Sequence, residues 1–142
     1  MPTVFTRIID GELPGTFVWR DDEVVAFLSI NPITYGHTLV VPRVEVDHWL
    51  DLDPKTWRRC AEVSQHVGQA IAKAFDPPRV GQMVAGFEVP HVHVHVLQIA
   101  DLGDLSFARA AKDPDPARLQ AAGEAIRTAL RDLGHGEHVP EA

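Results

Sequence analysis

The sequence predicts a single α+β domain in which an antiparallel sheet of about five strands packs against a long central helix and a C-terminal helix. Short β-branched runs separated by turn residues predict the strands, and two amphipathic stretches predict the helices. The strands lie before and after the long helix instead of alternating with helices, which favours antiparallel pairing. We expect the helices to cover one face of the sheet and the other face to be free for a site.

Five segments have the composition of strands, and the polar, Gly or Pro residues between the first three supply turns. These strands are expected at 16–19, 24–28, 37–41, 81–85 and 91–99.

Two helices are predicted with their ends. Asp53 followed by Pro54 matches an N-cap and a first helical position, and apolar residues then recur every three or four positions as far as Phe75. The last helix is expected from about 115 to 133, where Gly134 is placed to terminate it.

Composition limits the classes of partner. The chain has 142 residues, of which 13 are basic and 20 acidic, and its net charge of −7 argues against a polynucleotide or an anionic membrane as partner. The single cysteine, Cys60, cannot form an internal disulfide, which suits a cytoplasmic protein. Neither a signal-peptide core nor a run of about 18 apolar residues is apparent.

The histidines are the most informative feature. Three of the eight fall within five residues, at 91, 93 and 95, and valines alternate with them. In a strand this period of two sends the histidines to one face and the valines to the other. We expect the valines to face inward.

Three interpretations of this run are open from the residues alone. In the first, the run is simply a solvated strand face. In the second, two of its histidines bind a metal together with His37 or a carboxylate. Alternatively, one neutral imidazole attacks phosphorus while its neighbours bind the phosphate oxygens. An unperturbed imidazole pKa near 6.5 leaves the ring mostly neutral at pH 7, and clustering disfavours its charged form further.

The segment 91–97 resembles the His-φ-His-φ-His-φ-φ motif of the histidine triad (HIT) family of nucleotide hydrolases and transferases. The stretch 36–42, Gly-His-Thr-Leu-Val-Val-Pro, is similar to that family's Gly-His-x-Leu-Val-x-Pro stretch, and the opening residues 4–14 resemble the family's opening. The blocks match in order and spacing over roughly residues 3 to 100. The resemblance implies a single HIT domain over 1–142, with a tail at 134–142 that we expect to be flexible.

Roles for individual residues follow from the resemblance. It implies that His93 is the nucleophile, forming a nucleotidyl-histidine intermediate on the α-phosphorus. It implies that His95 and His37 contact the phosphate or organise the site, and that His91 orients the nucleophile. Residues expected in substrate binding are Phe5, Ile8, Phe27 and Ile30, which form an apolar slot for base and sugar, and Ser29, Gly86 and Glu88.

The chain departs from the family pattern near its N-terminus. Many bacterial relatives carry a Cys-x-x-Cys zinc pair there and a histidine shortly after the Val-x-Pro segment. Thr3, Thr6 and Glu45 hold those places here. We therefore expect no structural zinc and no other metal or cofactor.

Further departures fall in the expected substrate site. Ser29 stands where the family usually has a carboxylate that binds the ribose hydroxyls. Serine offers one neutral hydroxyl instead. Phe87 stands where glutamine is common, and Glu88 where some members have serine or threonine near the leaving group. An ionised Glu88 would repel a phosphate, whereas a protonated one can serve as the leaving-group acid.

The sequence predicts a HIT-type hydrolase that cleaves nucleoside phosphoramidates or related nucleotide esters at the α-phosphorus. Its partner is expected to be a small nucleotide, and the resemblance implies a homodimer. Two alternatives are a dinucleoside polyphosphate hydrolase of the same family and a weakly catalytic, nucleotide-binding regulatory module.

Overall fold

The computed structural model describes residues 1–141 and contains the expected five-stranded antiparallel sheet. Its strands, in the order β1-β2-β3-β5-β4, are β1 (Phe17–Arg20), β2 (Val24–Leu28), β3 (Thr38–Pro42), β5 (Val94–Ile99) and β4 (Arg79–Met83). Every neighbouring pair is antiparallel. The α+β class predicted from the sequence is confirmed.

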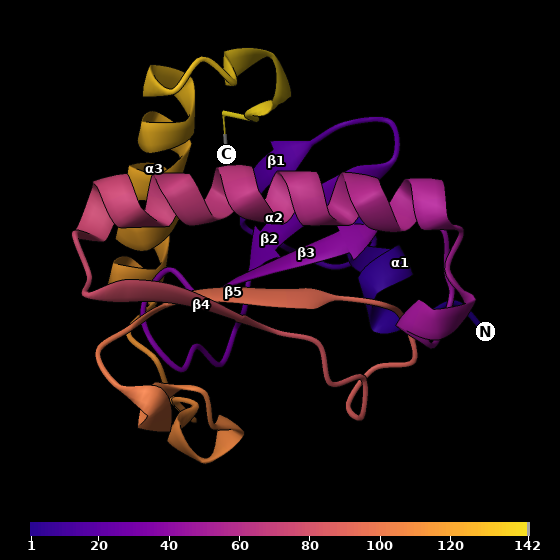
Figure 1. Cartoon of the computed structure of the whole chain (residues 1–142), viewed down its shortest axis with the longest axis horizontal. Coiled ribbons are helices and arrows are strands. Elements are labelled where there is room, and N and C mark those ends of the chain that lie inside the picture. The colour runs from indigo at the N-terminus through magenta and orange to yellow at the C-terminus, as the bar shows by residue number, and fades with distance from the viewer. Residues whose placement is uncertain (142) are drawn as a thin grey trace.

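The long helix α2 (Pro54–Phe75) has the predicted bounds. The Asp53 side chain accepts a hydrogen bond from the Lys55 N–H, which caps the first turn. Asp76 ends the helix in the left-handed region at φ 48°, and two prolines follow it. Figure 1 shows α2 lying across the sheet, with α3 (Pro116–Asp132) packed against it.

The main core lies between these two helices and one face of the sheet. It contains Val92, Val94 and Val96, so the valines face inward as predicted. Arg127 of α3 is also buried, and its guanidinium donates to the Phe17 carbonyl at 2.9 Å and to Glu124. This contact ties α3 to β1.

A short helix that the strand and helix patterns did not predict covers the opposite face. Helix α1 (Val4–Ile9) is capped by Thr3, whose hydroxyl accepts from the Thr6 N–H. Its Phe5 and Ile9 form a second apolar cluster with side chains of β1, β2 and β3. The helix therefore covers part of the face that the sequence left free.

The histidine run differs from the expected strand at its start. The segment 91–99 was expected to be one strand, but β5 begins at Val94, so His91 and His93 precede it. The Val92 N–H donates to Val46 outside the sheet and the His91 N–H donates to the Val89 carbonyl, so the ladder starts later. β4 likewise begins two residues earlier than predicted and ends before Val84.

The chain after Gly134 packs on the core. Short helix η4 (Gly136–His138) places the His138 ring against Trp19, with centroids 4.7 Å apart, and Val139 packs against the main core. The flexibility of this tail stays a prediction. Within residues 1–141, no helix is both long and apolar enough to cross a membrane.

Asp21, at the turn between β1 and β2, joins the sheet to α2. Its carboxylate accepts from the Trp19 indole, from the N–H groups of Glu23 and Val24, and from the Arg59 guanidinium. These donors hold the pKa of Asp21 below its usual range against the opposing effect of burial. Removing the carboxylate would leave several half-buried donors unsatisfied.

We expect Asp21→Ala to lower the free energy of unfolding by about 2–3 kcal/mol. Urea denaturation followed by tryptophan fluorescence measures this change. Asp22→Ala is the matched control, because Asp22 is exposed and no hydrogen bond of its side chain is seen in the described part of the chain. Its effect should stay within about 0.5 kcal/mol. Equal effects of the two substitutions would contradict the role given to Asp21.

Candidate active site

The sheet face beneath α1 carries the candidate site. Phe27, Leu39 and His95 lie in register across β2, β3 and β5. Because side chains alternate along a strand, these three share the face opposite the main core. The α1 residue Phe5 packs edge-on against the His93 ring, with centroids 4.9 Å apart.

A cavity of about 730 Å³ opens on this face. The structure places most of the predicted site residues on its lining: His37, His93, His95, Phe5, Ile8, Phe27, Ser29, Ile30 and Glu88. His91 is fully buried behind His93, and Gly86 does not line the cavity. The imidazoles of the triad are 5% exposed or less, which argues against a solvated strand face.

The backbone fixes the tautomer of His93. Its Nδ1 lies 2.7 Å from the carbonyl oxygen of His91. A carbonyl only accepts, so His93 Nδ1 carries the proton and Nε2 keeps a free lone pair. His93 is thus arranged as a neutral nucleophile at the cavity wall.

His91 is held from both sides of its ring. Its Nε2–H donates to the Pro42 carbonyl at 2.8 Å, so Nδ1 accepts from the Thr3 hydroxyl, also at 2.8 Å. The Thr3 N–H and the Thr6 hydroxyl both donate to Glu45 at 2.7 Å. This chain of hydrogen bonds connects the N-terminal segment to the residue whose carbonyl orients His93.

His37 and His95 form a second directed pair. The Ile33 N–H donates to His37 Nδ1 at 3.1 Å, which puts the His37 proton on Nε2. That proton is donated to His95 Nδ1 at 2.9 Å, so a neutral His95 carries its own proton on Nε2. His95 can therefore donate a hydrogen bond to a phosphate oxygen without being charged.

Burial keeps these rings neutral. Together with the neighbouring histidines, it lowers the pKa of His37 to about 4 and that of His95 to about 3. Burial is also the main cause that lowers the pKa of His91 and of His93. For His93, the His91 carbonyl and the nearby Glu88 carboxylate oppose this effect.

Comparison with known proteins agrees with this geometry. The HIT domain family matches residues 10–101. The chain belongs to the HIT family. An uncharacterized HIT-like protein of Mycobacterium tuberculosis is 35% identical over 92% of this chain and 94% of its own.

Two crystal structures are similar over nearly the whole HIT chain, each with a TM-score of 0.80. One is a Zn-bound histidine triad family protein from Mycobacterium smegmatis, 28% identical, covering 94% of this chain and 96% of that one. The other is a hypothetical histidine triad nucleotide-binding protein from Sulfolobus tokodaii, 29% identical, covering 91% and 92%. The predicted family and fold are confirmed.

The residues at the expected zinc positions of this HIT protein do not fit a zinc ion. Thr3, Thr6 and Glu45 offer two hydroxyls and one carboxylate, and hydrogen bonds to one another and to His91 already engage them. Zinc in structural sites prefers thiolate and imidazole ligands. Across residues 1–141, no group of three or more His, Cys, Asp or Glu side chains is placed to hold a metal.

Sequence reasoning missed one wall of the cavity. The segment between β5 and α3 contributes Phe107, three alanines and Lys112 to the lining. The Phe107 ring packs edge-on against His95, with centroids 4.9 Å apart. No motif marks this segment, because its residues reach the site through tertiary packing.

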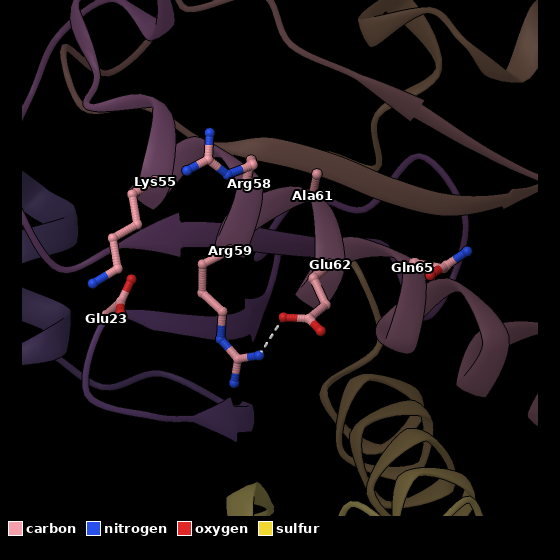
Figure 2. Close-up of a pocket in the computed structure, with 7 residues that line it drawn as sticks. All are labelled: Glu23, Lys55, Arg58, Arg59, Ala61, Glu62 and Gln65. Carbon is pink, nitrogen blue, oxygen red and sulfur yellow. Dashed lines mark hydrogen bonds and ion pairs between the residues drawn. The ribbon is translucent and has the colours of Figure 1, made fainter.

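A second hollow of about 620 Å³ lies on α2 and shares no lining residue with the cavity at the histidines (Figure 2). Its charged side chains are basic at Lys55, Arg58 and Arg59 and acidic at Glu23 and Glu62. Figure 2 shows Arg59 bonded to Glu62. Arg59 is already engaged by Glu62 and Asp21, and none of the described lining residues is a histidine, so we assign no function to this hollow.

Buried neutral histidines make the stability of the protein depend on pH. Their pKa values in the folded state lie below the unfolded value of about 6.5, so the unfolded state binds more protons between the two. The stabilisation is complete above pH 6.5 and is lost as pH falls toward about 4 for His37 and about 3 for His95.

We expect the free energy of unfolding to fall as pH is lowered from 6.5 to 5, a window above the titration of most carboxyl groups. Each such histidine contributes a limiting slope of about 1.4 kcal/mol per pH unit. Urea titrations at several pH values should show a shallower slope for His37→Gln than for wild type. His48→Gln is the control, because His48 is exposed. An unchanged slope in His37→Gln would contradict the assignment of this pH dependence to His37.

Proposed function

We propose that this HIT protein hydrolyses nucleoside phosphoramidates or related nucleotide esters at the α-phosphorus. One observation supports this most strongly: the His91 carbonyl holds the proton of His93 on Nδ1 and leaves Nε2 free at the cavity wall. The apolar side chains of Phe5, Ile8 and Phe27 then line a slot suited to a base.

In the first step, His93 Nε2 attacks the α-phosphorus. A P–N bond to the imidazole forms, and the bond to the leaving nitrogen breaks with its electron pair. The Glu88 side chain, on the cavity lining, acts as the general acid and donates a proton to that nitrogen. The imidazole becomes cationic, and its Nδ1–H stays bonded to the His91 carbonyl.

In the second step, water attacks the same phosphorus and its proton passes to the Glu88 carboxylate. The P–N bond breaks, the electron pair returns to His93 Nε2, and a nucleoside monophosphate leaves. The Nε2–H of His95 stabilises the charge that develops on the phosphate oxygens in both steps. Covalent catalysis lowers the barrier because it replaces one difficult displacement at phosphorus with two easier ones.

Glu88 bears on the alternative functions. A dinucleoside polyphosphate has a leaving group that departs as a stable anion and needs no proton, so a general acid at Glu88 favours the phosphoramidate, whose leaving nitrogen does need one. A weakly catalytic regulatory module would bind nucleotides without needing the nucleophile. The turnover test below separates it from an enzyme.

We also propose a homodimer and a cytoplasmic location. The edge strand β4 has one side without a partner strand in the sheet, which supports pairing with a second copy. Cys60 is buried, and burial raises the pKa of its thiol to about 12, so the thiolate is disfavoured. This suits a chain without disulfides.

We expect His93→Ala to reduce hydrolysis of adenosine phosphoramidate below detection while the affinity for adenosine monophosphate stays within about tenfold. Rapid quenching followed by intact-mass measurement should find a nucleotidyl adduct on wild type and none on the variant. His48→Ala, which changes an exposed histidine outside the cavity, is the control and should retain activity. Full activity of His93→Ala would refute the nucleophile assignment.

We expect Glu88→Gln to slow phosphoramidate hydrolysis by about 100-fold, because an amine leaving group needs a proton. A nitrophenyl ester of the same nucleotide, whose leaving group departs as an anion, should be hardly affected. Comparing kcat for the two substrates measures this difference, and Glu12→Gln, outside the cavity lining, is the matched control. Equal slowing of both substrates would argue against Glu88 as the acid.

A further inference from the structure

One end of the cavity is polar and lies away from the nucleophile. Ser29, Asn31 and Lys112 line it. We propose that this end binds a second phosphate, carried on the sugar of the nucleotide, so that the preferred substrates are 2′- or 3′-phosphorylated nucleotides. This inference rests on the proposed function, because that function fixes where the base and the reacting phosphate lie.

Two hydrogen bonds to the backbone of Ala111 fix the position of the neighbouring Lys112 at the cavity rim. The Asn31 side-chain amide donates to the Ala111 carbonyl at 3.0 Å, and the Ala111 N–H donates to the Pro32 carbonyl at 2.9 Å. The segment that bears Lys112 is therefore fastened to the turn after β2. The lysine lies beside Ser29 and Asn31 although about 80 residues separate them.

The polar end of the cavity has a positive charge and a hydroxyl donor that suit an anion. Lys112 is the sole Lys or Arg side chain on the cavity lining, and no ion pair or hydrogen bond engages it within residues 1–141. The Ser29 hydroxyl accepts from the Asn31 N–H at 3.3 Å and keeps its own proton to donate. Glu88 is the sole carboxylate among the described residues of the lining, and it belongs to the segment before His93.

The sheet register separates this end from the reacting phosphate. The Ser29 N–H donates to the His37 carbonyl, which continues the pairing of β2 with β3. β3 pairs in turn with β5, so Ser29 lies two strand spacings, about 10 Å, from the strand of His95. With the base against Phe27 and the α-phosphate at His93, the sugar spans this distance. An anion beside Lys112 is therefore a different group of the same substrate.

Isothermal titration calorimetry tests the proposal with adenosine 5′-monophosphate and the 2′,5′- and 3′,5′-bisphosphates. We expect at least one bisphosphate to bind wild type about tenfold more tightly than the monophosphate. Lys112→Ala should reduce this ratio to near one. Lys73→Ala, which removes an equal charge outside the cavity, should leave the ratio as in wild type. Higher ionic strength should also reduce the ratio, because Lys112 is exposed.

The outcomes distinguish this inference from the proposed function. Equal affinity of wild type for all three ligands would overturn the sugar-phosphate site and leave the proposed function standing. A preference that persists in Lys112→Ala would overturn the role of Lys112. Failure of all three ligands to bind would overturn both proposals.

Discussion

The alternation of valine and histidine over residues 91–96 is the constraint on which core and site both depend. The valines pack under α2 and α3, and the histidines face α1 and the cavity. A shift of one residue in register would put imidazoles into the core and valines into the site. Selection for a stable core and for a competent site therefore acts on the same six residues.

Backbone groups control the chemistry of the histidines. The His91 carbonyl sets the proton of His93, the Ile33 N–H sets that of His37, and His37 sets that of His95. The His91 carbonyl only accepts and the Ile33 N–H only donates, and the tautomer that Ile33 fixes in His37 then fixes that of His95. The site thus presents one bare nitrogen and one N–H donor while every ring stays neutral.

Local pattern was enough to predict the elements that carry their own signals. Helix α2 has a cap, a Pro and a long apolar stripe, and its bounds were predicted to the residue. Helix α1 has only six residues and lacks such a stripe, so its expected role came from resemblance alone. The start of β5 depends on the hydrogen bond from the Val92 N–H to the Val46 carbonyl. Sequence spacing alone does not reveal this contact.

The candidate site shows the same division between residues that a local motif predicts and residues that only tertiary packing brings in. Residues within recognisable motifs, such as His37, His93 and His95, were predicted and do meet at one cavity. Partners from distant segments were not predicted. Thr3 bonds to His91 across 88 residues, and Asn31 bonds to Ala111, the neighbour of Lys112, across 80. Tertiary packing alone brings these groups together.

The net charge of −7 has to be reconciled with an anionic substrate. The overall field repels a nucleotide, and the neutral imidazoles supply directed N–H groups without a compensating charge. Attraction must then act at short range, where solvent screens it least. Lys112 is the lining residue that supplies such a charge, while burial keeps the nucleophile His93 neutral.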